Sequence, residues 1–147
     1  MPALTPQQTN EFLIGGNHIL RLATVTTEGW PYAVPVWYDY DGKTFTVLGR
    51  PANRWIPYLE REPRVGLLFD TTQEPFVRIT ASGTAEVVDK NWFGEWEYIA
   101  TRYVGQKAGH KYYEDTKHIP RVLIKITPGK FTTWTGSDWH PRYLPKG

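Results

Sequence analysis

The stretch from Arg21 to Asp70 constrains the fold more than any other part of the chain. It contains three short runs rich in β-branched and aromatic residues, and a tight turn separates each run from the next. The turns are Thr27-Glu28-Gly29 and Asp41-Gly42, both typical of β-hairpins. A short amphipathic helix and a fourth, wholly apolar run follow. The stretch therefore predicts an antiparallel meander with a helix inserted before its fourth strand.

The remaining sequence predicts further short strands and helices. Thr5 to Gln8 has the pattern of a capping box, with proline at the first helical position. Gly83 lies within a long β-branched run and indicates a bulge or sharp bend. Asp89 is expected to cap the helix that follows. Strands are expected at 18–26, 32–40, 44–48, 65–69, 76–88, 119–126 and 131–135, and helices at 6–14, 54–62, 90–104 and 107–116.

Six or more strands in hairpin order with few helices favour a closed or partly closed antiparallel barrel. The expected fold class is therefore mainly β with peripheral α-helices. No linker, internal repeat or low-complexity segment divides the sequence. Residues 1–147 are accordingly expected to form a single domain.

Composition and charge exclude several classes of function. The 17 Lys and Arg residues against 15 Asp and Glu give a net charge of +2, too near neutrality for a nucleic-acid-binding protein. With no cysteine, the chain has neither disulfides nor a thiolate nucleophile. The N-terminus lacks signal-peptide features and no apolar run approaches the ~20 residues of a membrane span, so a cytoplasmic protein without membrane contact is expected. The four histidines lack metal-ligand spacing, and no metal site is expected.

The strongest candidate for an anion site is the start of the helix predicted at 54–62. The preceding strand delivers Gly49 and Arg50 to this point, and Asn53 and Arg54 lie at the helix mouth. Free backbone N–H groups and the helix dipole favour negative charge there. The pattern predicts a phosphate-bearing cofactor across the sheet. The alternative is a solvated helix start in which Asn53 acts only as the N-cap.

Taken in order, a series of short segments resembles the pyridoxamine 5′-phosphate oxidase-like, FMN-binding split-barrel family. The resemblance covers nearly the whole chain except the first helix and the Trp92–Lys117 insert. The matching segments are Leu22-Ala23-Thr24-Val25, Gly29-Trp30-Pro31, Val34-Pro35-Val36-Trp37, Asp41-Gly42, Asn53-Arg54-Trp55, Leu59, Glu62-Pro63-Arg64-Val65, Pro120-Arg121-Val122-Leu123, Trp134-Thr135-Gly136 and Trp139-His140-Pro141-Arg142-Tyr143.

The resemblance implies a six-stranded split barrel that forms a homodimer with two cofactor sites at the interface. The cofactor implied is FMN, or alternatively a deazaflavin, with its phosphate near Arg54 and its ring on the strand that contains Pro35. The tail of one subunit would close the pocket of the other, with Trp139 and Arg142 binding the substrate. The cofactor-binding residues expected on this basis are Val34, Pro35, Val36, Trp37, Leu48, Gly49, Arg50, Asn53, Arg54, Trp55 and Trp134.

One position departs from the family pattern. Many members carry Ser-Arg-Lys or a similar basic pair where this chain has Asn53-Arg54-Trp55. An indole N–H can donate one hydrogen bond but brings no charge. Phosphate binding would therefore rest on Arg54, Arg50 and backbone N–H groups. Trp55 would either contact the cofactor or pack against the sheet as an ordinary helix residue.

The function implied is an FMN-dependent oxidoreductase that acts on an unknown small molecule. A dinucleotide-binding loop, a Walker pattern and a nucleophile elbow are all absent from the sequence, and no catalytic side chain is assigned. A bound flavin would carry the redox chemistry itself. Two alternatives remain open: a non-catalytic protein or sensor that binds flavin, deazaflavin or a haem-like ligand, and an interaction module whose aromatic face binds another protein.

Overall fold

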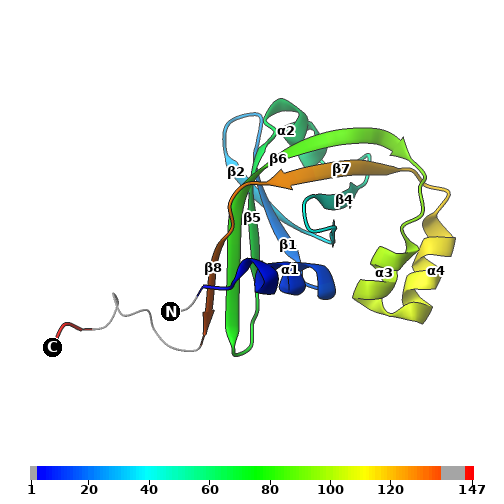
Figure 1. Ribbon diagram of the computed structural model, residues 1–147. Helices are drawn as coiled ribbons and strands as arrows, with labels where there is room; N and C mark the ends of the chain where they lie inside the picture. The colour runs from blue at the N-terminus through cyan, green and yellow to red at the C-terminus, as the bar shows by residue number, and fades with distance from the viewer. Residues whose placement is uncertain (1–2, 137–144) are drawn as a thin grey trace.

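The computed structural model describes residues 3–136 and 145–147, and its fold is an antiparallel sheet with four helices around it (Figure 1). The predicted fold class, mainly β with few helices, is confirmed. The elements follow the order α1 (Pro6–Gly15), β1 (Leu20–Val25), β2 (Pro31–Val36), β3 (Asp39–Tyr40), β4 (Phe45–Gly49), α2 (Trp55–Arg61), β5 (Arg64–Asp70), β6 (Phe76–Trp92), α3 (Glu97–Val104), α4 (Gln106–Thr116), β7 (Arg121–Pro128) and β8 (Thr132–Gly136).

The sheet is rolled so that its two ends meet. Its strands follow the order β2-β1-β5-β6-β7-β4-β3, and β8 pairs with β6 off this path. The two end strands, β2 and β3, are consecutive in the chain and are separated only by Trp37 and Tyr38. Because the three Cα–Cα steps from Val36 to Asp39 span at most ~11 Å, the ends of the sheet must lie close to each other there. The arrangement is a barrel that is left open between β2 and β3.

Two sequence predictions about the strands need correction. The single strand expected at 32–40 is two strands, because the chain crosses at Trp37 and Tyr38 from one end of the sheet to the other. The sheet has eight strands in the part of the chain that is described, whereas the resemblance implied six and the sequence pattern predicted seven. The eighth strand is β3, only two residues long, which the prediction joined to β2, and the run expected at 131–135 is β8.

The predicted hairpin turns are confirmed. Gly29 closes the β1–β2 turn with φ of +89°, and its N–H donates to the Thr26 carbonyl over 2.9 Å. Gly42 has φ of +95°, and the Asp41 carboxylate accepts hydrogen bonds from the backbone N–H groups of Lys43 and Thr44. Glycine is favoured at both turns because a side chain destabilises this backbone conformation. These turns determine the register of the strands on either side.

The first part of the helix predicted at 90–104 is wrong. β6 continues to Trp92, and α3 begins only at Glu97. Asp89 accepts a local hydrogen bond from the Asn91 N–H instead of capping a helix. Pairing with β7 extends the strand through this segment, with register shifts between Val87, Asp89 and Trp92. Strand pairing therefore overrides the local capping signal.

No bulge lies at Gly83, where a bulge or a sharp bend was predicted. Gly83 pairs regularly with Val65 on one side and Pro128 on the other. A Cβ atom at this position would lie 3.0 Å from the Thr127 carbonyl oxygen. Glycine is required because the β7 backbone approaches closely, whereas the irregular pairing begins after Val87.

The core has a main part inside the barrel and a smaller part beneath α3. The main part holds fully buried side chains from most strands, among them Leu22, Phe45, Phe69 and Ile124. The smaller part is formed by Trp96, Ile99 and Ala100, packed against half-buried aromatic rings. Figure 1 shows α3 and α4 beyond the ends of the long β6 and β7 strands, on the side away from β8. The two helices therefore form a separate layer beside the barrel.

Replacing Gly109 by alanine tests the close packing of α3 on α4. A Cβ atom at Gly109 would lie 2.6 Å from backbone atoms of Thr101, which cannot move without shifting α3. We expect Gly109→Ala to lower the free energy of unfolding by about 1–3 kcal/mol in urea denaturation. Gly15→Ala is the control because no atom lies within 4 Å of the added carbon. Equal stability of the two variants would contradict the packing.

Candidate functional site

A cleft of about 670 Å³ lies between the barrel and the α3–α4 layer. Its size is in the range of small-molecule and cofactor sites. The walls are mainly apolar and aromatic, and the charged side chains among them are two arginines. The lining residues are Val34, Pro35, Val36 and Trp37 from β2 and its end, Thr46 and Leu48 from β4, Arg50, Asn53 and Trp55 around the start of α2, Trp96, Ile99, Val104, Ala108 and Tyr112 from the α3–α4 layer, and Arg121 from β7.

The outer edge of β2 has no strand partner among the described residues, because β2 lies at the end of the sheet and pairs only with β1. The Thr26 N–H donates to the Trp30 carbonyl, and bonded pairs then recur at every second residue along the hairpin. Pro31 and Pro35 fall at the intervening positions, so their missing N–H groups cost no bond to β1. Backbone groups on the outer edge are therefore open to a ligand.

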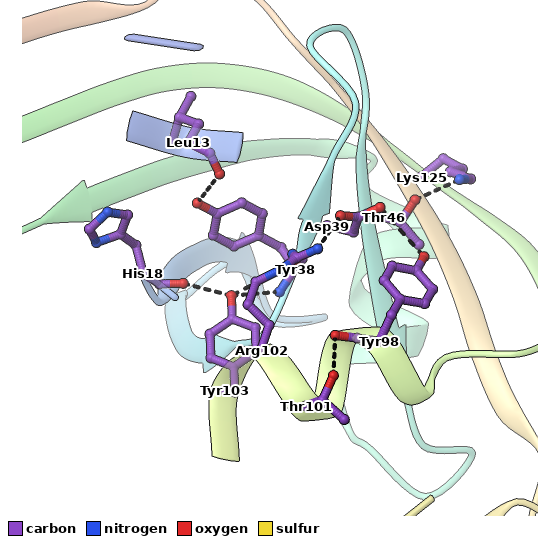
Figure 2. Close-up of polar contacts among 10 residues, drawn as sticks. All are labelled: Leu13, His18, Tyr38, Asp39, Thr46, Tyr98, Thr101, Arg102, Tyr103 and Lys125. Atoms are coloured by element: carbon purple, nitrogen blue, oxygen red, sulfur yellow. Dashed lines mark hydrogen bonds and ion pairs between the residues drawn. The ribbon is translucent and has the colours of Figure 1, made fainter. Parts of the chain in front are cut away.

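Helix α3 is attached to the junction between β2 and β3 by polar contacts (Figure 2). The Tyr103 hydroxyl donates to the His18 carbonyl over 2.7 Å and accepts from the Tyr38 N–H over 3.2 Å. The Arg102 guanidinium forms an ion pair of 2.9 Å with the Asp39 carboxylate. We call Tyr38, Asp39, Arg102 and Tyr103 the junction clamp. The clamp holds one wall of the cleft against the other.

The clamp also orients Trp37, the first residue after β2. Its ring stacks on the Tyr103 ring with centroids 4.9 Å apart and planes 2° from parallel. The Tyr112 ring meets it edge-on at 6.1 Å. Trp37 thus lies between the barrel and both helices, and it lines the cleft as the resemblance implies. Its position depends on α3 and α4 as well as on its own strand.

Burial keeps the clamp tyrosines in their neutral form. It raises the pKa of Tyr103 and, more strongly, that of Tyr38. Burial and the Asp39 carboxylate raise the pKa of Tyr98, whose hydroxyl faces Asp39 at 3.4 Å. These hydroxyls are therefore hydrogen-bond donors at neutral pH and carry no charge. Their role in the site is to position the helices, not to transfer protons.

The residues expected at the phosphate site divide into two groups. Arg50 and Asn53 line the cleft, and they close a turn in which the Arg50 N–H donates to the Asn53 side chain over 2.7 Å. Asn53 is not the N-cap. Arg54 is the N-cap residue of α2, is exposed, and is not among the lining residues. The structure therefore places Arg50 and Asn53 at the cleft and Arg54 beside it.

Trp55 is a packed residue that also faces the cleft. It is buried, with 5% of its surface exposed, and it belongs to the main core. Leu48 lines the cleft, whereas its neighbour Gly49 does not. A Cβ atom on Gly49 would lie 2.8 Å from the Ile56 side chain and 3.2 Å from the Trp55 ring. Gly49 therefore allows the start of α2 to approach β4.

Trp134 lies away from the cleft within the chain. It is on β8, which pairs with β6, and the Arg78 guanidinium lies 5.7 Å from the centroid of its ring. The resemblance assigns Trp134 to a pocket completed by a partner subunit, so its position in one chain does not decide that role. Trp139 and Arg142, expected to bind substrate, lie outside the described residues.

Sequence reasoning missed the wall formed by α3, α4 and the start of β7. Trp96, Tyr112 and Arg121 line the cleft, but none of them was predicted at the site. Trp96 and Tyr112 belong to the insert that the family resemblance left out. The sequence features that could have indicated this wall are the aromatic residues of the insert and Arg121 at the start of β7. Neither has a spacing that indicates a cleft.

A sequence model of the pyridoxamine 5′-phosphate oxidase family matches residues 5–135. The chain belongs to this family. None of the curated proteins matches it. The match includes the insert with α3 and α4, which the sequence resemblance had left out. The match agrees with the antiparallel split-barrel fold.

Solved structures show the same split-barrel fold. An F420 reductase is 20% identical with a TM-score of 0.66, covering 83% of this chain and 94% of its own. An FAD-binding protein from Mesorhizobium loti is 20% identical with a TM-score of 0.63, covering 93% and 97%. The haem storage protein HutZ from Vibrio cholerae is 19% identical with a TM-score of 0.62, covering 92% and 96%. At these identities the likeness concerns the fold alone.

The cleft fits a flavin-type cofactor and offers little to a metal. Aromatic and aliphatic walls suit a planar ring, and the open β2 edge offers backbone groups to its polar rim. Arg50 and Asn53 supply donors for a phosphate. In residues 3–136 and 145–147, no cluster of histidine and carboxylate side chains could hold a metal ion. Within the same residues, no helix is long and apolar enough to span a membrane.

Replacing Tyr103 by phenylalanine tests the junction clamp. The variant keeps the ring that stacks on Trp37 but leaves the His18 carbonyl and the Tyr38 N–H without their partner. We expect a loss of about 1–3 kcal/mol in the free energy of unfolding, measured by urea denaturation. Tyr32→Phe is the control, because the Tyr32 ring packs edge-on against Tyr58 outside the clamp. A loss no greater than that of the control would refute the clamp.

Proposed function

We propose that this protein is a flavin-dependent oxidoreductase that binds FMN, or alternatively a deazaflavin, in the cleft beside β2. The observation that carries the proposal is the cleft itself. It joins an unpartnered strand edge to aromatic walls and two arginines, and no acidic side chain is among its lining residues. Membership of the pyridoxamine 5′-phosphate oxidase family supports the same conclusion.

The chain's own residues would bind and orient the cofactor. Backbone groups on the outer edge of Val34 to Trp37 would meet the polar rim of the ring. The side chains of Leu48 and Trp55 would pack against it and exclude water. The Asn53 and Arg54 side chains, with backbone N–H groups of the turn from Arg50 to Arg54, would hold the phosphate. The bound flavin would supply the hydride chemistry, for which the protein provides position and electrostatics.

A homodimer is part of the proposal. Two cofactor sites would lie at the subunit interface, and the tail of one subunit would close the cleft of the other. Trp134 would then approach the ring in the partner's cleft, while Trp139 and Arg142 would contact the substrate. The open β2 edge and the exposed side chain of Trp30, at 71%, are consistent with a surface that a second subunit covers.

A non-catalytic storage role is the second candidate, since one protein of the same fold is named a haem storage protein. The described part of the cleft offers few ligands for haem iron. Its lining residues include no histidine, cysteine or methionine, and its only tyrosine is Tyr112, whose hydroxyl accepts a hydrogen bond from Arg50. Haem iron in proteins is held by these residue types. An assay for turnover distinguishes a protein that stores a flavin from an oxidoreductase.

Cofactor titration tests the proposed function. We expect FMN or an F420-type deazaflavin to bind saturably, near one per subunit, and to quench tryptophan fluorescence, because Trp37 and Trp55 line the cleft. Reduction of the bound cofactor by a donor, followed by reoxidation by an acceptor, would establish the oxidoreductase. Saturable binding without turnover would favour storage. Binding of neither cofactor would overturn the flavin proposal.

Replacing Arg54 by alanine tests its assignment to the phosphate. If Arg54 pairs with the phosphate, its loss should weaken binding of the phosphorylated cofactor by roughly 1.5–3 kcal/mol, the range for a hydrogen bond to a charged group. Binding of riboflavin, which lacks the phosphate, should not change. Arg64→Ala is the matched control because Arg64 is exposed on β5 and does not line the cleft. An unchanged FMN dissociation constant in folded Arg54→Ala would reject the assignment.

A further inference from the structure

Arg121 is a buried cation without a carboxylate partner among the described residues. Only 5% of its surface is exposed, and it lines the cleft at the start of β7. Its guanidinium donates to the Ile119 carbonyl over 2.9 Å, and to the Thr116 hydroxyl over 2.8 Å and carbonyl over 3.4 Å. All three acceptors are neutral. None of the seven ion pairs among the described residues involves Arg121.

The neighbours of Arg121 orient its charge without neutralising it. The guanidinium carbon lies 4.5 Å from the centroid of the Trp96 ring and 5.9 Å from that of the Tyr112 ring. Aromatic faces and the C-terminal end of α4 both attract a cation. A buried charge without a counterion is nevertheless costly, and an anion restores the balance. The packing therefore holds a positively charged plane at the wall of the cleft.

Arg50 approaches the same tyrosine from the α2 side. Its Nη2 atom donates to the Tyr112 hydroxyl over 2.8 Å. Arg50 also has no carboxylate partner within the described residues. Two arginines from distant parts of the chain thus contact one phenol ring on α4. Because no acidic side chain lines the cleft, this end of it is positively charged.

We propose that Arg50, Tyr112 and Arg121 form an anion subsite for the small molecule that enters the cleft. The ligand class is a carboxylate or phosphate group on an apolar or aromatic body. Arginine suits both groups because its planar fork donates two parallel hydrogen bonds. The apolar walls formed by Ile99 and Val104 suit the body of the ligand. The identification of this ligand as the reacting substrate rests on the proposed function, whereas the anion subsite itself does not.

Binding of simple anions to the cofactor-free protein tests the subsite. The probes are benzoate and phenyl phosphate, with benzamide as a neutral analogue of benzoate, and the signal is tryptophan fluorescence. We expect at least one of the two anions to bind saturably, and benzamide to bind about tenfold more weakly or worse. Arg121→Gln and Arg50→Gln should each weaken anion binding by about tenfold. Arg64→Gln, which removes the same charge away from the cleft, should have no effect.

Several results would overturn the subsite: no saturable binding of either anion, equal binding of benzamide, or an equal loss in Arg64→Gln. If Arg121→Gln fails to fold, the exposed Arg50 carries the test through Arg50→Gln. A different result would assign Arg50, Tyr112 and Arg121 to the cofactor phosphate and reject the proposal. In that case Arg121→Gln and Arg50→Gln would bind FMN no more tightly than riboflavin, while their binding of benzoate would not change. The anion titration contains no flavin, so its result does not depend on whether the protein binds a flavin.

Discussion

The contact between the Tyr103 hydroxyl and the β2–β3 junction is the interaction on which the candidate site depends. The α3–α4 layer contributes few fully buried apolar residues of its own, since its core consists of Trp96, Ile99 and Ala100. Apolar burial on this scale places a pair of helices loosely. The hydroxyl satisfies two backbone groups at once and holds the ring that stacks on Trp37. This directional contact and the ion pair between Arg102 and Asp39 determine the position of α3 and α4, and therefore the width of the cleft.

The junction also links the way the barrel closes to the way it can bind a ligand. A two-residue connection brings the end strands of the sheet together without pairing them, because the chain turns away at Trp37. The β2 edge therefore stays open in the described chain, and the prolines at positions 31 and 35 remove donors from the side that faces away from β1. An edge of this kind is poorly suited to extending a sheet and well suited to meeting a ligand. The helices then supply the aromatic and cationic wall opposite it.

Local signals in the sequence were sufficient for most of the barrel. Glycine at the two hairpin turns and alternation along the strands depend on neighbouring residues, so the meander could be predicted. The helix expected from Lys90 failed because pairing with β7, a contact distant in sequence, overrides the capping chemistry of Asp89. The α4 wall could not be predicted for the same reason: Tyr112 and Arg121 meet only through tertiary packing. Arg54 lies at the predicted helix start, but the sequence does not determine whether its side chain faces the cleft.

A flavin bound between the β2 edge and the α3–α4 layer would cover backbone segments on both sides of the cleft. Hydrogen–deuterium exchange of the protein with and without saturating FMN, or a deazaflavin, locates the bound cofactor because it reports which backbone segments a ligand protects. We expect slower exchange at 33–38, 48–55 and 96–112 in the bound protein, with the remainder of the barrel unchanged. Protection confined to other segments, or no protection at saturating cofactor, would contradict this placement of the cofactor.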